Sequence, residues 1–132
     1  MLYTLHFDGS CWPNPGGKCG YGWHCSRGDD RIAAGQGEVF DEPRTNNVGE
    51  FRGLIAALEF AVCLTDAKLI VIRGDSLLVV KCANRRMKSK KPHLQALILK
   101  VHVLLSRLAA PWIVEWVGRE QNSEADRLAD II

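Results

Sequence analysis

Hydrophobic and polar positions alternate along the first forty residues, and clusters of turn-forming residues interrupt the alternation. The pattern predicts strands over residues 2–8, 21–27 and 31–40. Between them lie a loop rich in glycine, proline and asparagine, at 9–17, and a turn at 28–30. Short consecutive strands with tight links indicate an antiparallel meander.

From residue 48 onward the spacing changes to that of helices alternating with strands. Apolar side chains recur at helical spacing over residues 48–63, and again from Pro92 to Leu108. The remaining expected elements are buried strands over 68–73 and 112–117, a short helix over 76–84, and a last helix that opens at Ser123. The order βββαβααβα predicts an α/β fold: a five-stranded mixed sheet, with the meander followed by parallel strands, and helices on both faces.

Composition places the chain among globular proteins. It has 132 residues, of which 47% are hydrophobic, so we expect residues 1–132 to form a single domain. No apolar run approaches the roughly 20 residues needed to span a bilayer, and the N-terminus does not resemble a signal peptide. We therefore expect a cytoplasmic protein, and no sequence signal argues against a monomer.

The five cysteines are odd in number and form no C-x-x-C pair, which favours reduced, mostly packed thiols over disulfides or zinc.

Charge is unevenly distributed, although the net charge is only +2. Between Asp75 and Glu115 there are eight basic residues and no acidic ones. Five of them form a basic cluster in "RRMKSKK": Arg85, Arg86, Lys88, Lys90 and Lys91. Such a cluster suits a phosphate backbone, and a solvated turn is an equal alternative.

Four carboxylates lie at the ends of predicted elements, and each has a structural alternative. Asp8 ends the first strand and could serve only in a turn. Glu50 lies three residues after Asn47, and Asp126 three residues after Ser123, so both fit a helix capping box. Asp75 could be the N-cap of the helix that follows it.

Taken together, the four carboxylates favour a metal site. In a sheet of this order the first and fourth strands can lie parallel, which brings Asp8 and Asp75 to neighbouring carboxyl ends, where open sheets bind ligands. Helices starting near Glu50 and Asp126 could flank them. Clustered carboxylates repel one another, and a divalent cation relieves the repulsion. Oxygen ligands without histidine or cysteine favour Mg²⁺ or Mn²⁺, and two such ions about 4 Å apart can hydrolyse a phosphodiester.

Four segments in order resemble the type 1 ribonuclease H family over nearly the whole chain. They are "FDGSCWPNPGGKCGYG", "TNNVGE", "GDS" and "EADRLAD". The resemblance implies a ribonuclease H-like fold and an endonuclease that cuts the RNA strand of RNA–DNA hybrids. It also implies that Mg²⁺ or Mn²⁺ is needed and that the products carry 3′-hydroxyl and 5′-phosphate ends.

The resemblance also assigns residues by motif. The metal ligands and catalytic residues would be Asp8, Glu50, Asp75 and Asp126. Contacts to the hybrid would come from Asn14, Thr45, Asn46 and Asn47, whose amides and hydroxyl can pair with phosphates and with the RNA 2′-hydroxyl. Helix capping is the alternative for Asn46 and Asn47.

One feature departs from the family pattern, and another resembles the shorter forms of the family that lack a basic protrusion. Many members carry a histidine in the loop before the last aspartate, whereas this loop reads "GREQNSEAD", with Arg119 or Glu120 near that place. The basic cluster is also much shorter than the basic helical protrusion of well-known bacterial members, so we expect a weaker grip on the hybrid. Two alternatives stay open. The missing histidine and the atypical loop leave a hybrid-binding module whose catalysis is weak or lost, and a nuclease of the same fold could act on double-stranded RNA or DNA junctions instead.

Overall fold

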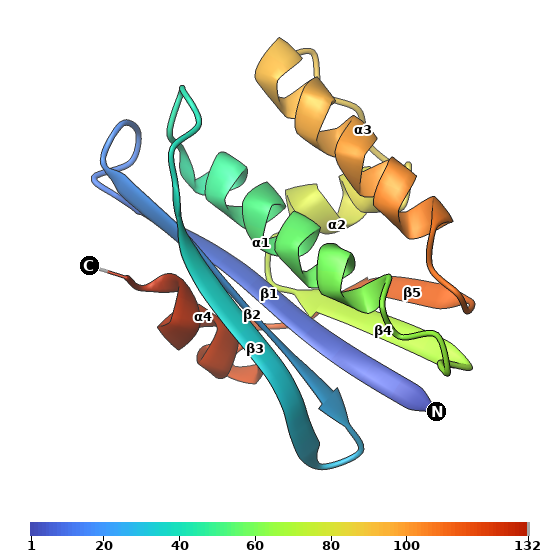
Figure 1. The fold of residues 1–132 in the computed structure, drawn as a ribbon. Helices are drawn as coiled ribbons and strands as arrows, with labels where there is room; N and C mark the ends of the chain where they lie inside the picture. Colours follow the sequence, from blue (N-terminus) through green and yellow to red (C-terminus); the bar gives the residue numbers. More distant parts are fainter. Residues whose placement is uncertain (132) are drawn as a thin grey trace.

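A computed structural model describes residues 1–131, and its elements follow the predicted order (Figure 1). The strands are β1 (Leu2–Trp12), β2 (Lys18–Arg27), β3 (Asp30–Val39), β4 (Leu69–Gly74) and β5 (Trp112–Trp116). The helices are α1 (Asn46–Ala61), α2 (Leu77–Ala83), α3 (Pro92–Ser106) and α4 (Ser123–Ala129), with a 3₁₀ turn, η1, at Arg119–Gln121. Every predicted strand and helix is present, which confirms the α/β class.

The five strands form one mixed sheet in the order β3-β2-β1-β4-β5. β1 runs antiparallel to β2 and parallel to β4, and β5 is parallel to β4. β1 continues four residues past its predicted end, because Gly9 to Trp12 remain paired with β2 as far as Lys18. The predicted loop therefore shrinks to residues 13–17.

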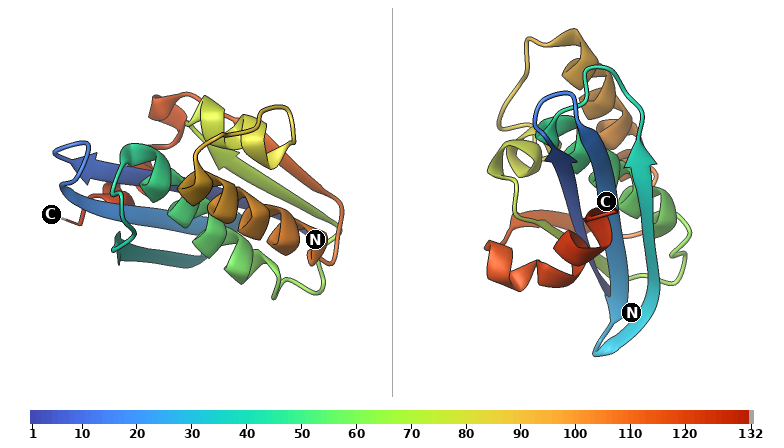
Figure 2. Two further views of the ribbon diagram at one scale, coloured as in Figure 1. Left: turned by 90° about the horizontal axis from the view of Figure 1, so that it is seen from above. Right: turned by 90° about the vertical axis from the view of Figure 1, so that its left-hand side faces the viewer.

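Helices cover both faces of the sheet, as predicted (Figure 2). α1 packs along β1 and β2 on one face, while α4 packs on β1 and β2 from the other. α3 packs on α1 and α2 as an outer layer (Figure 1). Alternate β1 residues Tyr3, Leu5 and Phe7 are buried in the core, as expected for a strand with two different faces.

Helix α1 begins two residues earlier than the hydrophobic pattern predicts. The cap is Thr45, whose Oγ1 accepts a hydrogen bond from the Val48 backbone N–H at 3.2 Å. The capping interpretation of Asn46 and Asn47 is therefore wrong. Asp75 is not a cap either, because Ser76 Oγ accepts from the Val79 N–H at the start of α2.

The prediction that the cysteines are reduced is wrong for one pair. Cys11 and Cys19 are joined by a disulfide, with Cα atoms 4.0 Å apart, because the register of β1 and β2 places them opposite each other. Cys25 and Cys82 are buried free thiols, as predicted, whereas Cys63 is exposed. Trp116 is 54% exposed at the end of edge strand β5.

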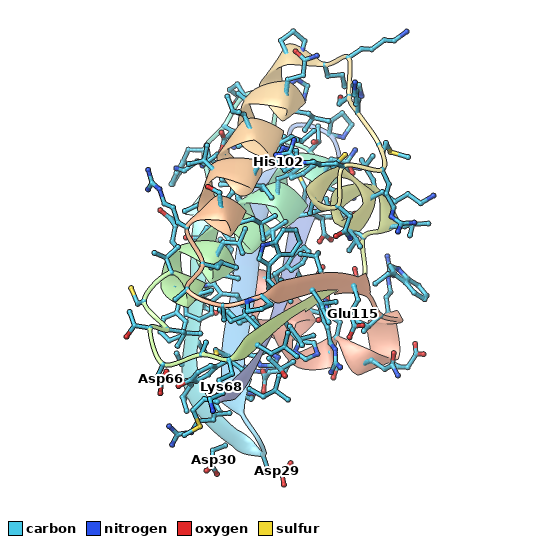
Figure 3. The ribbon with its side chains drawn as sticks, turned by 90° about the vertical axis from the view of Figure 1, so that its right-hand side faces the viewer. Asp29, Asp30, Asp66, Lys68, His102 and Glu115 are labelled. Carbon is cyan, nitrogen blue, oxygen red and sulfur yellow. A yellow bond between two sulfur atoms is a disulfide. The ribbon has the colours of Figure 1, made fainter. Side chains whose placement is uncertain are left out.

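Figure 3 shows where several polar side chains outside the apolar core lie. Asp29 and Asp30 lie at the tip of the β2–β3 hairpin (Figure 3). His102 points from α3 toward α2, where its Nε2 lies 2.9 Å from the Cys82 carbonyl oxygen (Figure 3). Within residues 1–131, no helix combines the length and the apolar character that a bilayer crossing requires.

Candidate active site

Three carboxylates converge where β1 and β4 approach their carboxyl ends. Asp8 lies in β1, and Asp75 directly follows β4, the parallel neighbour of β1. Glu50 reaches the same point from α1. Asp8, Glu50 and Asp75 each offer an oxygen, and these oxygens lie within 4.8 Å of one another. The predicted convergence of these three residues is therefore present in the structure.

Glycines let α1 lie close enough to β1 for Glu50 to reach Asp8. A Cβ atom on Gly53 would lie 2.6 Å from the Asp8 carbonyl oxygen, and one on Gly9 would collide with the backbone of Gly49. The helix and the strand thus touch backbone to backbone, a contact open only to residues without a side chain.

A second close contact brings α4 onto the sheet. A Cβ on Gly22 would lie 2.5 Å from Leu128 Cβ, and Ser10 Oγ donates a hydrogen bond to the Ala129 carbonyl at 3.0 Å. Asp126, on the first turn of α4, is exposed and lines the same cavity as the other three carboxylates. The fourth predicted ligand therefore lines the cavity but lies outside the group of three whose oxygens are within 4.8 Å of one another.

Burial and mutual repulsion disfavour the ionised forms of the carboxylates in this site. Asp8 is 4% exposed and Glu50 is 8% exposed. Burial is the main factor that raises the pKa of Asp8 to about 7, and the charge of Asp75 adds to it. Burial, and then the neighbouring Asp8, raise the pKa of Glu50 well above its usual value. Glu50 Oε2 is buried without a hydrogen-bond partner, so the site fits a cation with oxygen ligands.

Asp75 is held by two groups that the sequence does not reveal. The Asn122 side-chain NH₂ donates to Asp75 Oδ2 at 3.2 Å and to the Phe7 carbonyl at 2.9 Å. Trp116 Nε1 donates to the Asp75 backbone carbonyl at 3.1 Å. No sequence motif assigns a role to Asn122 or Trp116. Their contacts with Asp75 depend on tertiary packing, which local sequence patterns do not reveal.

The carboxylates line a cavity of about 560 Å³. Arg119 lines it as well, whereas Glu120 is exposed and is not among the lining residues. Of the two residues near the missing histidine, only Arg119 thus faces the carboxylates. The cavity also includes residues not predicted from sequence: Ser10, Ser76, Arg127 and Asp130.

The four predicted hybrid contacts gather in a neighbouring hollow of about 480 Å³. It is lined by Asn14, Thr45, Asn46 and Asn47, and also by Lys91 of the basic cluster. The Asn46 backbone N–H donates to Asn14 Oδ1 at 3.0 Å, which joins the glycine-rich loop to the start of α1. Asn46 and Asn47 line both cavities, so the hollow continues into the carboxylate site.

The structure divides the basic cluster. Arg85 and Lys88 line a separate hollow of about 270 Å³ against α3, with Leu99 and His102. Arg86 and Lys90 are exposed in the connecting turn. Lys91 is the member that shares a hollow with the predicted hybrid contacts.

Comparison with known proteins gives a consistent family assignment. A family described as "Reverse transcriptase-like" matches residues 6–131. The chain is 38% identical over 133 residues to the bifunctional protein Rv2228c of Mycobacterium tuberculosis, and 35% identical over 125 residues to ribonuclease HI of Halobacterium salinarum. These alignments cover 98% and 95% of this chain, but only 35% and 61% of the relatives. The chain therefore spans less than two thirds of these curated relatives.

Solved structures match over nearly their whole length. The N-terminal RNase H domain of Rv2228c superimposes with a TM-score of 0.88 at 36% identity, covering 98% of this chain and 97% of that one. RNase H1 of Halobacterium salinarum gives 0.87 at 33% identity, covering 98% and 96%. LC11-RNase H1, solved in complex with an RNA/DNA hybrid, gives 0.85 at 26% identity, covering 97% and 94%.

Proposed function

Because this chain belongs to the type 1 ribonuclease H family, we propose that it is a metal-dependent endoribonuclease that hydrolyses the RNA strand of RNA–DNA hybrids. The observation that carries the proposal is the convergence of Asp8, Glu50 and Asp75, with a buried Glu50 oxygen that has no protein partner. The hybrid bound to LC11-RNase H1 supports the choice of substrate. The products would carry 3′-hydroxyl and 5′-phosphate ends.

Asp8, Glu50, Asp75 and Asp126 would hold the metal. The cofactor we propose is a pair of Mg²⁺ or Mn²⁺ ions, because every donor is a hard carboxylate oxygen. Bound divalent ions supply an activated water and stabilise the leaving oxygen of the phosphodiester. The protein would hold these ligands in advance, because Asp8 and Glu50 are buried where α1 packs on β1, while Asp126 is exposed and could adjust when substrate binds.

The hollow beside the carboxylates would hold the hybrid. The side-chain oxygen Oδ1 of Asn14 already accepts a hydrogen bond from the Asn46 backbone N–H. The side-chain NH₂ group of Asn14 is therefore the end that can donate to a phosphate or sugar oxygen. Asn46 and Asn47 line both hollows and would place the RNA strand over the carboxylates. Contacts with the 2′-hydroxyl would distinguish RNA from DNA. Arg119 would put a cation near the scissile phosphate, in the region where other members carry histidine.

The second candidate function is a hybrid-binding module without catalysis. The observation that favours it is the loop "GREQNSEAD", which lacks the histidine of many members. Location in the cytoplasm and a monomeric state stay predictions of the sequence.

The test is cleavage of an end-labelled RNA–DNA hybrid in Mg²⁺, in Mn²⁺ and in EDTA, with RNA–RNA and DNA–DNA duplexes as controls. We expect metal-dependent cutting of the RNA strand of the hybrid alone. Asp75→Asn keeps the size of the side chain but loses its charge, and we expect it to lower the rate at least about 100-fold, as for loss of a metal ligand. If folded wild-type protein binds the hybrid but cuts it in neither metal, the binding module is the correct function.

A further inference from the structure

Asn122 lies at the junction of three of the elements that form the carboxylate site. It precedes α4, which carries Asp126, and its backbone carbonyl accepts from the Asp126 N–H at 3.0 Å. Its side chain reaches the Phe7 carbonyl in β1, one residue before Asp8, and the carboxylate of Asp75. The residue is 1% exposed, so solvent cannot replace these bonds.

The chemistry of its neighbours fixes the orientation of the Asn122 amide. A backbone carbonyl and a carboxylate are both acceptors, so the group facing them must be the NH₂ donor. The Oδ1 atom then points elsewhere, and it is buried without a protein partner. A buried amide oxygen without a partner is costly, which argues that the two donated bonds are what this side chain contributes.

Asp75 is therefore restrained at its backbone and at its carboxylate by the chain that runs from the end of β5 to the start of α4. Trp116 Nε1 holds its backbone carbonyl, and the Asn122 amide holds its Oδ2. Asp75 follows the last residue of β4, so strand pairing alone does not fix its side chain. One hydrogen bond to Oδ2 still leaves lone pairs on this carboxylate that could bind a cation together with Asp8 and Glu50.

We propose that Asn122 is the positioning residue that holds the Asp75 carboxylate in its metal-binding orientation and aligns α4 with β1. This inference rests on the proposed function, since it concerns the metal of that site. Partners that orient a metal ligand commonly change metal affinity or activity by about 10- to 100-fold when they are lost.

The experiment compares the variants Asn122→Asp and Asn122→Ala with a control variant in which another hydrogen-bonded asparagine is replaced. Asn122→Asp preserves shape but replaces the donor with an acceptor beside Asp75. The control is Asn84→Ala, because the Asn84 NH₂ also donates to two carbonyls, of Val80 and Val114, away from the carboxylates. Mn²⁺ binding to protein without nucleic acid is measured by the electron paramagnetic resonance signal of free Mn²⁺. The melting temperature in EDTA is measured for each variant, together with kcat and KM for cleavage of the hybrid.

We expect both Asn122 variants to weaken Mn²⁺ binding about 10- to 100-fold and to lower kcat, with little change in KM for the hybrid. Asn84→Ala should lower the melting temperature and leave Mn²⁺ binding unchanged. Wild-type Mn²⁺ affinity in Asn122→Asp, or an equal loss of affinity in Asn84→Ala, overturns the proposal. So does failure of both Asn122 variants to fold, since the residue would then serve the fold itself. If the Asn122 variants lose Mn²⁺ affinity but the wild-type protein cuts no hybrid, the proposed function is refuted and the positioning role of Asn122 stands.

Discussion

At the scale of single residues, two stacked imidazoles illustrate how burial changes chemistry outside the active site. His6 and His24 lie opposite each other in β1 and β2, with ring centroids 4.8 Å apart, on the face away from Leu5. Burial is the main factor that lowers the pKa of His6 to about 4, and it also lowers that of His24. Nearby Arg73 and Arg31 lower them further, opposed by Glu115 and Glu124.

These shifts predict a loss of stability in acid. Above the unfolded pKa of 6.5 both states are neutral and the full stability is present. As pH falls from 6.5 toward 4, the unfolded chain binds protons that the folded chain excludes, so the free energy of unfolding decreases. We expect His6→Phe to remove about 1–2 kcal/mol of this loss between pH 7 and 5, after allowing for partial solvent contact.

Urea unfolding in EDTA at several pH values checks this prediction. The comparison with wild type isolates the imidazole, because the buried carboxylates, whose raised pKa values act in the opposite direction, are common to both proteins. If the free energy of unfolding changes with pH in the same way for wild type and for His6→Phe, the prediction is refuted.

The sequence predicts residues well where a local pattern carries the chemistry. Asp8, Asp75 and Glu50 stand at element ends in recognisable segments, and the structure brings them together. Asn122 could not be predicted, because its role comes from burial against β1, 115 residues away from Phe7. The Cys11–Cys19 bond was missed for the same reason: it depends on strand register, which spacing alone does not give.

At the scale of elements, the contact between α1 and β1 sets the distance between two of the proposed metal ligands, Asp8 and Glu50. Gly53 would normally be a weak point in a helix, and alanine there would gain about 1 kcal/mol in helix propensity. Here an added Cβ would lie 2.6 Å from the Asp8 carbonyl oxygen, so α1 would have to move away from the strand.

We therefore expect Gly53→Ala to destabilise the protein by about 1–3 kcal/mol, and to slow cleavage because Glu50 moves with the helix. Urea unfolding and the hybrid assay measure the two effects. Glu59→Ala, an exposed change on the same helix, should stay within about 0.5 kcal/mol of wild type. A stabilised Gly53→Ala protein would show that helix propensity outweighs the contact.

Element order and type followed from periodicity, because the amphipathic stripes are long and regular. Element ends were less accurate. Thr45 rather than Asn47 caps α1, since capping depends on which of several suitable side chains has the extended backbone of the cap position. β1 extended through Trp12 because pairing with β2 outweighed a local sequence typical of loops.

At the scale of the whole molecule, charge that is continuous in sequence is divided in space. Lys91 lines the hollow of the predicted hybrid contacts, whereas Arg85 and Lys88 face a different hollow against α3. A one-dimensional charge count cannot make this distinction.

We expect Lys91→Ala to weaken hybrid binding and to reduce the slope of log affinity against log salt by about one. Binding is measured with the Asp75→Asn variant as background, so that cleavage does not interfere. Lys100→Ala, an exposed lysine on α3, is the control and should leave the slope unchanged. Replacing all five cluster residues without any change in slope or affinity would exclude the basic cluster as a phosphate contact.

The four carboxylates come from β1, α1, the end of β4 and α4, and thus from residues 8 to 126. No short fragment carries more than one of them. A chain that has collapsed but not yet docked its last helix holds an incomplete set of the proposed ligands, however ordered the rest of it is. The proposed nuclease activity should therefore arise only at the end of folding and vanish at the first local opening of α4, so that partly folded copies leave nucleic acid intact.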